Sequence, residues 1–166
     1  MIGKKLNRKK VIILGSSGYI GSFLSSKLKE KYNLINHSRK KIKDKNFNLS
    51  IKKHIYGDIT RPKTLDSIIK LRPDIIIYTL SLNHKISERN LEFSIKNNFL
   101  PLANLSKKIL LKKNYKPKII YLSTVQVYGR EYGNKIIINE QFRKKIDNIY
   151  AFTHSMCEDY LSINKS

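Results

Sequence analysis

Cysteine is almost absent from this sequence: it occurs once among 166 residues, as Cys157. A single cysteine excludes an intramolecular disulfide and any metal cluster built on cysteine thiolates. The four histidines, His37, His54, His84 and His154, are scattered without the close spacing of metal ligands, so we expect no metal site. Without a disulfide framework, the sequence favours a protein of the reducing cytoplasm.

Long hydrophobic runs are also missing. The longest apolar stretch, Ile75–Leu82, includes a tyrosine, a threonine and a serine, and it is far shorter than the roughly 20 residues that cross a bilayer as a helix. Near the N-terminus, the run Val11–Leu14 stops at Gly15, too early for the apolar region of a signal peptide. We therefore expect neither membrane spanning nor secretion.

Acidic residues are scarce: 12 Asp and Glu stand against 34 Lys and Arg, which gives a formal charge of +22. Such a charge attracts polyanions, including nucleic acids. The lysines, however, occur in pairs along the whole chain, and Lys, Ile and Asn are all abundant while alanine occurs only at two positions. An AT-rich coding sequence produces this joint bias, so we interpret most of the charge as solvated surface. A nucleic-acid partner remains the minor alternative.

The length suits one domain, and we expect a basic tail at residues 1–9 followed by a domain at residues 10–166. Short β-branched runs alternate with amphipathic segments. Strands are predicted at residues 10–14, 34–37, 54–56, 74–80 and 118–123, and helices at residues 19–31, 62–71, 88–113 and 149–164. Pro101 is expected to kink or split the third helix. This alternation predicts right-handed βαβ units, hence an α/β fold with a Rossmann-like doubly wound parallel sheet of about five strands.

Three glycines follow the first predicted strand at a spacing of three, in the segment Gly15-Ser-Ser-Gly18-Tyr-Ile-Gly21. Gly15 would allow a tight turn with positive φ, Gly18 would let backbone N–H groups approach a diphosphate, and Gly21 would let the helix pack closely on the strand. The helix N-terminus would add partial positive charge. Strand, spacing and helix together predict a dinucleotide site rather than a plain strand–helix connection.

This turn resembles that of the extended short-chain dehydrogenase/reductases, the NAD(P)-dependent family of sugar-nucleotide epimerases and dehydratases. Later segments are similar to the family's motifs in the same order, over about residues 10 to 165. They are Tyr56-Gly57-Asp58-Ile59-Thr60, the strand Pro73–Ile77, Asn98 ahead of Asn104-Leu105, the segment Leu122–Gly129 with its Ser/Thr-bearing strand end and Val-Tyr-Gly turn, Asn139-Glu140, and Tyr150. An ordered set of this kind is more specific than the glycines alone.

The resemblance implies a nicotinamide dinucleotide bound at the glycine-rich turn, with Asp58 and the backbone of Ile59 near the adenine. The cofactor-binding residues that we expect are Gly15, Ser17, Gly18, Tyr19, Ile20, Gly21, Ser38, Arg39, Asp58, Ile59, Leu80, Asn98, Tyr150 and His154. At Leu80 the family has a small residue against the cofactor, so this leucine could crowd the nicotinamide side.

The residues after the second predicted strand bear on the choice between NAD and NADP. An acidic side chain there would bind the adenosine ribose hydroxyls and favour NAD. The sequence instead reads Asn36-His37-Ser38-Arg39-Lys40-Lys41, without an acid. Ser38 and Arg39 suit a 2′-phosphate, so NADP is preferred. NAD remains the alternative, with Arg39 then an ordinary surface charge.

For the chemistry, the resemblance implies a Tyr-x-x-x-Lys helix and a Ser/Thr at the end of the fifth strand. The tyrosine takes or returns the proton of a sugar hydroxyl, and the lysine lowers the pKa of that tyrosine. Thr124 and Tyr150 occupy the matching positions, but the lysine position holds His154. Histidine is shorter and largely neutral at cytoplasmic pH. We expect Tyr150 and His154 to be either a weak catalytic pair or ordinary helix residues over a retained pocket.

Members of this family continue past the last predicted helix into further strands and a small C-terminal lobe. The fifth strand would then be a sheet edge, and we expect a homodimer or a second chain to cover it, or a truncated polypeptide. The first hypothesis is an NAD(P)-dependent epimerase, dehydratase or reductase with a nucleotide-sugar substrate. The second is a catalytically silent dinucleotide-binding module, and the third is a polyanion-binding protein on the same fold.

Overall fold

The computed structural model describes residues 8–41, 53–129 and 137–164. Most of the basic tail expected at residues 1–9 therefore lies outside the described residues. The chain divides into two compact units. The first comprises Met1–Leu80 and Lys108–Tyr121, the second comprises Ser81–Lys107 and Leu122–Ser166, and each is described by itself.

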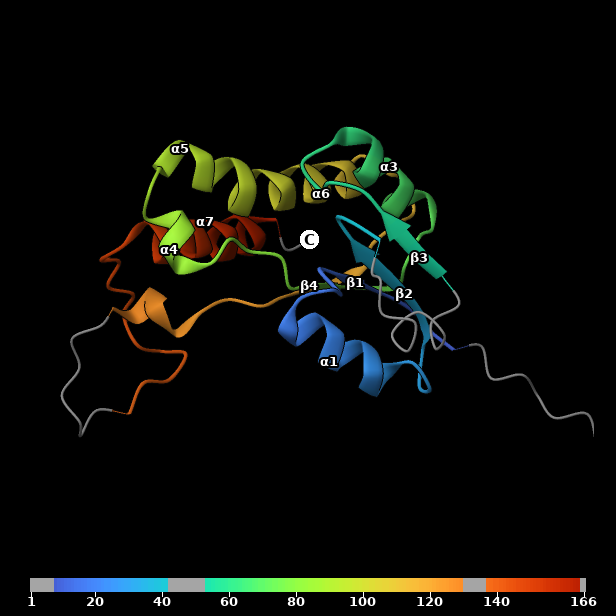
Figure 1. The fold of residues 1–166 in the computed structure, drawn as a ribbon, viewed down its shortest axis with the longest axis horizontal. Coiled ribbons are helices and arrows are strands. Elements are labelled where there is room, and N and C mark those ends of the chain that lie inside the picture. Colours follow the sequence, from blue (N-terminus) through green and yellow to red (C-terminus); the bar gives the residue numbers. More distant parts are fainter. Residues whose placement is uncertain (1–7, 42–52, 130–136, 165–166) are drawn as a thin grey trace, which may run out of the picture. The chain divides into compact units, whose positions relative to one another are not determined.

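The first unit is built on a parallel sheet of five strands in the order β3-β2-β1-β4-β5 (Figure 1). The strands are β1 (Lys10–Leu14), β2 (Asn33–Ser38), β3 (Lys53–Tyr56), β4 (Ile75–Tyr78) and β5 (Lys118–Tyr121). The strand order changes direction at β1, and ligands of open α/β sheets bind beyond the carboxyl ends of the strands at such a point. The Rossmann-like doubly wound sheet predicted from the sequence is confirmed.

The centre of the sheet is filled by β-branched residues, because parallel strands are covered on both faces. Ile12, Ile13 and Ile76 are fully buried there. Burial of a side chain of this size contributes about 1.5–3 kcal/mol. Core packing therefore fixes the position of β1, and with it the start of the turn that follows.

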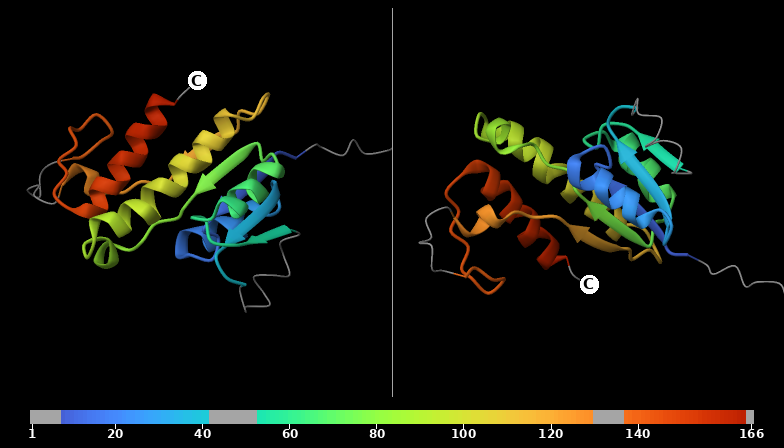
Figure 2. Two further views of the ribbon diagram at one scale, coloured as in Figure 1. Left: turned by 90° about the horizontal axis from the view of Figure 1, so that it is seen from above. Right: turned by 60° about the horizontal axis from the view of Figure 1, so that its bottom comes forward.

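Two helices, α1 (Tyr19–Leu28) and α3 (Pro62–Lys70), lie on opposite faces of this sheet (Figures 1 and 2). α3 begins at Pro62. Proline has no N–H, but N–H groups in the first turn of a helix have no intrahelical partner, so proline is well tolerated there. Its apolar side chains Leu65, Ile68 and Ile69 are buried. The periodicity of these residues explains why the segment forms a helix that covers a sheet.

The second unit contains α4 (His84–Ser87), α5 (Leu91–Ser94), most of α6 (Leu100–Leu110), the 3₁₀-helix η2 (Val125–Tyr128) and α7 (Ile149–Ile163). A π-helical turn, η1 (Ile95–Phe99), lies between α5 and α6. Pro101 stands in the first turn of α6, and since proline has no N–H to donate, the hydrogen-bond pattern changes before it. The segment predicted as a helix over residues 88–113 is helical without a break from Leu91 to Leu110, with the π-helical turn η1 just before Pro101.

Candidate functional site

The glycine-rich turn follows β1 directly and is fixed by hydrogen bonds to β2. The backbone N–H groups of Gly15 and Ser16 both donate to the carbonyl of His37, at 3.1 and 2.9 Å. Gly15 has φ +91°, and a Cβ atom there would lie 2.7 Å from Oγ1 of Thr79. Both the positive φ and this close approach require glycine.

The other two glycines have different surroundings. A Cβ on Gly21 would collide with the backbone carbonyl of Gly15, so Gly21 lets α1 pack directly on the turn. A Cβ on Gly18 would meet only that same carbonyl oxygen, at 3.3 Å. The first turn of α1 contains no acidic residue, and Gly18 offers no capping side chain. The helix thus begins with backbone N–H groups that no acidic or capping side chain engages, which is an arrangement that fits an anionic diphosphate.

Three further residues predicted for the cofactor lie around this turn. Ser17, Tyr19 and Ile20 are exposed, and Tyr19 retains 93% of its accessible surface. Leu80 is half-buried, and its side chain lies so close to Gly15 that a Cβ there would be 2.9 Å from it. The structure therefore places Leu80 against the turn, where the sequence suggested crowding.

The basic residues after β2 line a small cavity of about 320 Å³ with Ser17. Its other lining residues are Arg39, Lys40 and Lys41, all exposed. Ser38 is buried instead: its hydroxyl donates to the carbonyl of Lys40 at 2.7 Å and lies 2.9 Å from Nε2 of His54. The run of three basic residues therefore faces the cavity, while the Ser38 hydroxyl is held inside.

Asp58 stabilises the turn after β3. Its Oδ1 atom accepts from the backbone N–H of Thr60 at 2.9 Å and from the Thr60 hydroxyl at 2.7 Å. The Thr60 backbone N–H is the main reason that the pKa of Asp58 is lowered; the Thr60 hydroxyl and the charges of Arg39 and Arg61 act in the same direction, against partial burial. Asp58 is therefore an anion at neutral pH, and the neighbouring Ile59 is buried.

In the second unit, Tyr150 stands in the first turn of α7, and two polar side chains hold that turn. The side chain of Asn148 caps the helix by accepting from the N–H of Ala151 at 2.8 Å. Glu88 accepts from the N–H of Tyr150 at 2.9 Å. The half-buried Tyr150 ring also packs edge-on against His84, with ring centroids 5.9 Å apart. Neither Asn148 nor Glu88 was singled out by the sequence motifs, although an asparagine just before a helix is a capping signal.

His154 is one turn further along α7 and is almost completely buried, with 2% of its surface accessible. Its Nε2 atom lies 3.1 Å from the hydroxyl of Ser81, and its ring is 4.4 Å from the ring of Tyr150. Burial lowers the pKa of His154 to about 4, although the charge of Glu158 acts in the opposite direction. The ring that takes the lysine position is therefore uncharged at neutral pH.

Asn98 belongs to the π-helical turn η1, and its side chain is enclosed in the second unit. Its Oδ1 atom accepts from the N–H of Leu82 at 2.8 Å, and its amide donates to the hydroxyls of Thr153 and Ser87 at 3.0 and 3.4 Å. These bonds join η1 to α7 and to the segment after β4. The structure thus places this predicted cofactor residue inside a polar network.

Thr124 caps the 3₁₀-helix η2 by accepting from the N–H of Gln126 at 3.3 Å. It lines a cavity of about 390 Å³ in the second unit. The other lining residues are Ser123, Val125, Val127, Tyr128, Ile138, Asn139, Glu140 and Glu158. Thr124 and the Asn139-Glu140 motif are thus brought together, whereas Tyr150 and His154 are not among the residues of this cavity.

One charged cluster escaped the sequence reasoning. Lys144 forms ion pairs with Glu158 at 2.9 Å and with Asp159 at 2.7 Å, and the Ser123 hydroxyl donates to Glu158. The sequence feature that could have indicated this cluster is the adjacent pair of acids, Glu158 and Asp159, in a chain with few acidic residues. The cluster ties the segment before α7 to the helix itself and borders the Thr124 cavity through Glu158.

Among the residues that the structure describes, no group of three or more His, Cys, Asp or Glu side chains is placed to hold a metal ion. No helix in the same ranges combines the length and the apolar character needed to cross a bilayer.

The fold and the glycine-rich turn define a Rossmann-like α/β protein of the nucleotide-binding type. The sequence match then identifies the family: the model of the NAD dependent epimerase/dehydratase family covers residues 11–163, and the chain belongs to that family. No curated protein matches the sequence.

Solved structures with the same fold include several enzymes. A UDP-Glc/GlcNAc 4-epimerase from Campylobacter jejuni superposes with a TM-score of 0.80 at 21% identity, over 94% of this chain and 49% of its own. A nucleoside-diphosphate-sugar epimerase from Agrobacterium tumefaciens gives 0.79 at 18% identity, over 94% and 48%. An L-threonine dehydrogenase from Clostridium difficile gives 0.78 at 22% identity, over 95% and 49%. The chain therefore spans about half the length of these structures.

Proposed function

We propose that this chain carries the cofactor-binding part of an NAD(P)-dependent sugar-nucleotide epimerase, dehydratase or reductase, with residues 10–166 working as one nucleotide-binding domain. The observation that carries the proposal is the glycine-rich turn, where α1 begins without an acidic or capping side chain in its first turn. Membership of the epimerase/dehydratase family supports the same class. The buried single cysteine, Cys157, agrees with a place in the reducing cytoplasm.

The turn fits the diphosphate of a dinucleotide because its backbone N–H groups and the N-terminus of α1 supply partial positive charge without a competing carboxylate. In this proposal Ser17, Gly18 and the first turn of α1 bind the diphosphate. Asp58 and the backbone of Ile59 lie at the adenine. When bound, the cofactor supplies the hydride chemistry: it accepts a hydride from a substrate carbon or returns one to it.

NADP is the preferred cofactor because the cavity beside the turn is lined by Arg39, Lys40 and Lys41. Three cations suit a 2′-phosphate far better than a neutral ribose hydroxyl. Ser38, expected to share this role, donates inward to the carbonyl of Lys40. The preference therefore rests on Arg39 and the two lysines. NAD remains the alternative, as in the family's name and in a Bordetella bronchiseptica structure that contains NAD+.

In the proposed reaction, Tyr150 takes or returns the proton of a sugar hydroxyl, and Thr124 positions that hydroxyl by a hydrogen bond. Glu88 and Asn148 hold the turn of α7 that carries Tyr150. His154 is neutral at neutral pH, so it offers a hydrogen-bonding ring in place of a lysine charge. Stabilisation of the Tyr150 phenolate is therefore weak, and we expect slow turnover.

The buried, neutral His154 also supports a second candidate: a catalytically silent dinucleotide-binding module. In such a protein Tyr150 and His154 stabilise α7, and cofactor binding is the whole activity. β5 is a terminal strand of the described sheet, which favours a homodimer or a second chain that covers it. Chromatographic sizing of the native protein tests this partnership, and a monomer at all concentrations would contradict it.

Gly18 offers a direct test of the proposed function. Gly18→Asp places a carboxylate over the N-terminus of α1, where the diphosphate would bind, and we expect it to abolish binding of NAD and NADP in either redox state. Gly18→Ala is the matched control: its methyl group makes one tight contact, with a carbonyl oxygen at 3.3 Å, and adds no charge, so we expect it to fold and to bind with only modest loss. Isothermal titration calorimetry measures all four cofactor forms.

Absence of heat with wild-type protein at millimolar cofactor would contradict dinucleotide binding. Equal affinity of wild type and Gly18→Asp would contradict the assignment of the turn as the diphosphate site. Tighter binding of NADP than NAD, lost in Arg39→Gln, is the expected result for the basic cavity.

A further inference from the structure

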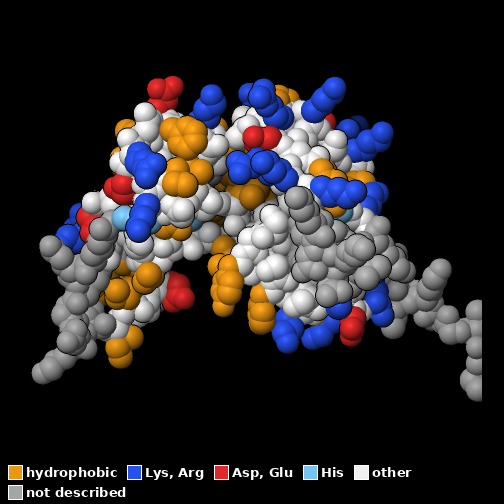
Figure 3. Space-filling model, viewed as in Figure 1, with side chains coloured by type: hydrophobic (Ala, Val, Ile, Leu, Met, Phe, Trp, Pro, Cys, Tyr) orange, Lys and Arg blue, Asp and Glu red, His pale blue; other side chains and the backbone are white. Residues whose placement is uncertain are grey.

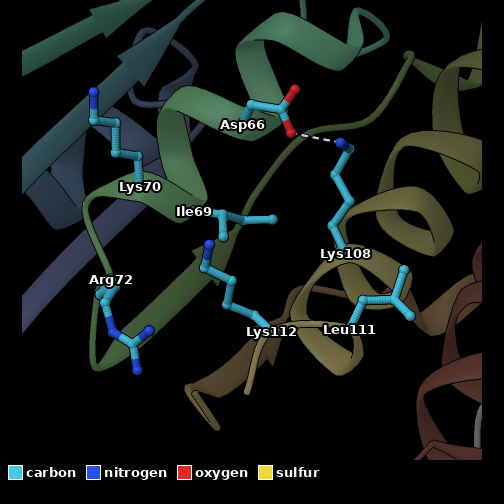
Figure 4. A pocket seen from close by; sticks show the side chains of 7 residues that line it. All are labelled: Asp66, Ile69, Lys70, Arg72, Lys108, Leu111 and Lys112. Carbon is cyan, nitrogen blue, oxygen red and sulfur yellow. Dashed lines mark hydrogen bonds and ion pairs between the residues drawn. The ribbon is translucent and has the colours of Figure 1, made fainter. Parts of the chain in front are cut away.

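A second basic cavity opens on the first unit, at the amino ends of β4 and β5. It has a volume of about 640 Å³, within the range of about 300–1,000 Å³ found for small-molecule sites. Its lining comes from α3, from the C-terminal end of α6 and from the segments before the two strands: Asp66, Ile69, Lys70, Arg72, Lys108, Leu111 and Lys112 (Figure 4). The glycine-rich turn follows the carboxyl end of β1. Because the strands are parallel, the turn and the cavity lie at opposite ends of the strands of the same sheet.

The charge of this cavity is one-sided. Four of the seven lining residues are cations and one is an acid. The acid, Asp66, is engaged by the Lys108 ammonium group. The Lys112 side chain points toward Ile69 (Figure 4). Lys and Arg side chains also gather on the face over α3, with few acids among them (Figure 3). The cavity therefore has a positive field that Asp66 offsets only in part.

Arg72 is held in place before any ligand arrives. Its guanidinium group donates to the carbonyl of Asn114 and lies 4.9 Å from the centre of the Tyr115 ring. The Tyr115 hydroxyl in turn donates to the carbonyl of Pro73 at 3.0 Å. Arg72 and Asn114 both have positive φ, +45° and +56°. A cation fixed in this way loses little conformational freedom on binding, which favours recognition of an anion.

We propose that this cavity is a binding site for a small polyphosphate anion, either inorganic or the phosphate chain of a nucleotide. Phosphate oxygens accept charge-assisted hydrogen bonds from several lysines and one arginine at once. A nucleic-acid strand is disfavoured because the lining offers no aromatic ring for base stacking; Tyr115 is buried beside Arg72. An acidic peptide would need a longer apolar groove than Ile69 and Leu111 provide.

Asp66 gives the site a competitor of its own. Its carboxylate holds Lys108 in the free protein, and an incoming polyphosphate must take over that ammonium group. A chain of two or three phosphates carries more charge and offers more oxygens to Lys108 and Lys112 than a single phosphate does. The affinity should therefore rise from phosphate to pyrophosphate to tripolyphosphate.

Titration of the ¹⁵N-labelled full chain with sodium phosphate, pyrophosphate, tripolyphosphate and ATP tests the proposal by NMR. Backbone amide signals of residues 70–72 and 108–112 report on the cavity, and those of residues 15–18 report separately on the glycine-rich turn. The inference does not depend on dinucleotide binding, so the two sets of signals can succeed or fail independently. ATP binding more tightly than tripolyphosphate at the cavity assigns a nucleotide ligand, and equal binding assigns the inorganic ion.

Three variants sharpen the test. Lys112→Gln should weaken pyrophosphate binding at the cavity about tenfold, as expected for one lost charge-assisted hydrogen bond. Asp66→Asn, which removes the competitor, should tighten it several-fold. Lys31→Gln, in the exposed turn between α1 and β2, makes the same change in net charge as Lys112→Gln and should leave the affinity unchanged.

Two results would overturn the proposal. Equal weakening by Lys112→Gln and Lys31→Gln would show attraction to the overall charge of the chain only. Shifts confined to residues 15–18, with no response at residues 70–72 and 108–112, would show that polyphosphates bind the glycine-rich turn alone.

Discussion

His154 illustrates how burial alters the chemistry of a single side chain. The ring retains 2% of its accessible surface, and burial lowers its pKa to about 4. Near the phenol of Tyr150, 4.4 Å away between ring centres, it therefore contributes no positive charge at neutral pH. A phenolate needs such a charge to form near pH 7, because the ordinary pKa of tyrosine is about 10.

Replacement of His154 by lysine restores a cation one helical turn from Tyr150. We expect His154→Lys to raise turnover of a nucleotide-sugar at least about tenfold if the chain is an enzyme, since general acid–base catalysis typically contributes 10²–10⁴-fold. Product formation from a panel of nucleotide-sugars, followed by chromatography with added NADP or NAD, measures it. His154→Gln should stay as slow as wild type, and Tyr150→Phe in the His154→Lys background should remove the gain. No gain in turnover, in a variant that folds and binds cofactor, would favour the silent module.

At the scale of the element, the relation between α1 and the glycine-rich turn decides whether a diphosphate can approach. α1 packs so closely that a Cβ on Gly21 would collide with the carbonyl of Gly15, while a Cβ on Gly18 would meet only that carbonyl oxygen, at 3.3 Å. The two glycines thus serve different purposes within one motif: Gly21 sets the position of the helix, and Gly18 keeps its N-terminus accessible.

The variants Gly21→Ala and Gly18→Ala should therefore differ in their free energy of unfolding. We expect Gly21→Ala to lower the free energy of unfolding by about 1–3 kcal/mol, the usual effect of overpacking, and to weaken dinucleotide binding because the turn must move. Gly18→Ala should lower stability less, because a Cβ there lies 3.3 Å from the Gly15 oxygen, whereas one on Gly21 would collide with it. Urea unfolding followed by circular dichroism measures both variants, and equal stabilities would contradict the packing role of Gly21.

At the scale of the whole molecule, folding buries one histidine in each unit. His37 in the first unit and His154 in the second both have their pKa lowered to about 4 by burial. The unfolded chain titrates its histidines near the ordinary value of 6.5. Between these values the unfolded state binds more protons, so stability is fully present above about pH 6.5 and is lost as pH falls toward 4.

The expected result is a free energy of unfolding that falls steadily from pH 7 to pH 4.5, by up to about 3 kcal/mol for each fully buried histidine. His37→Gln and His154→Gln should each flatten this dependence relative to wild type, because each removes one group that must stay uncharged. Urea titrations at several pH values measure the slopes. Slopes identical in wild type and both variants would contradict the assigned burial.

The alternation of β-branched and amphipathic segments determined the fold class, because strand and helix periodicities differ and neighbouring parallel strands need crossovers. The glycine spacing likewise indicated the turn, since its requirements are local to a few backbone atoms. The sequence pattern did not predict the π-helical turn η1 inside the helix expected over residues 88–113. Such a turn depends on how the backbone hydrogen bonds are arranged just before Pro101, which has no N–H to donate.

What the sequence could not determine is where each polar side chain points. Ser38 and Arg39 are adjacent, yet the hydroxyl turns inward to Lys40 while the guanidinium faces a cavity. Asn98 could be assigned to a cofactor by its motif, but contacts with Leu82 and Thr153, distant in sequence, place it in an internal network. The tertiary structure alone decides such matters, because burial and charge at a site arise from residues that the chain brings together only on folding.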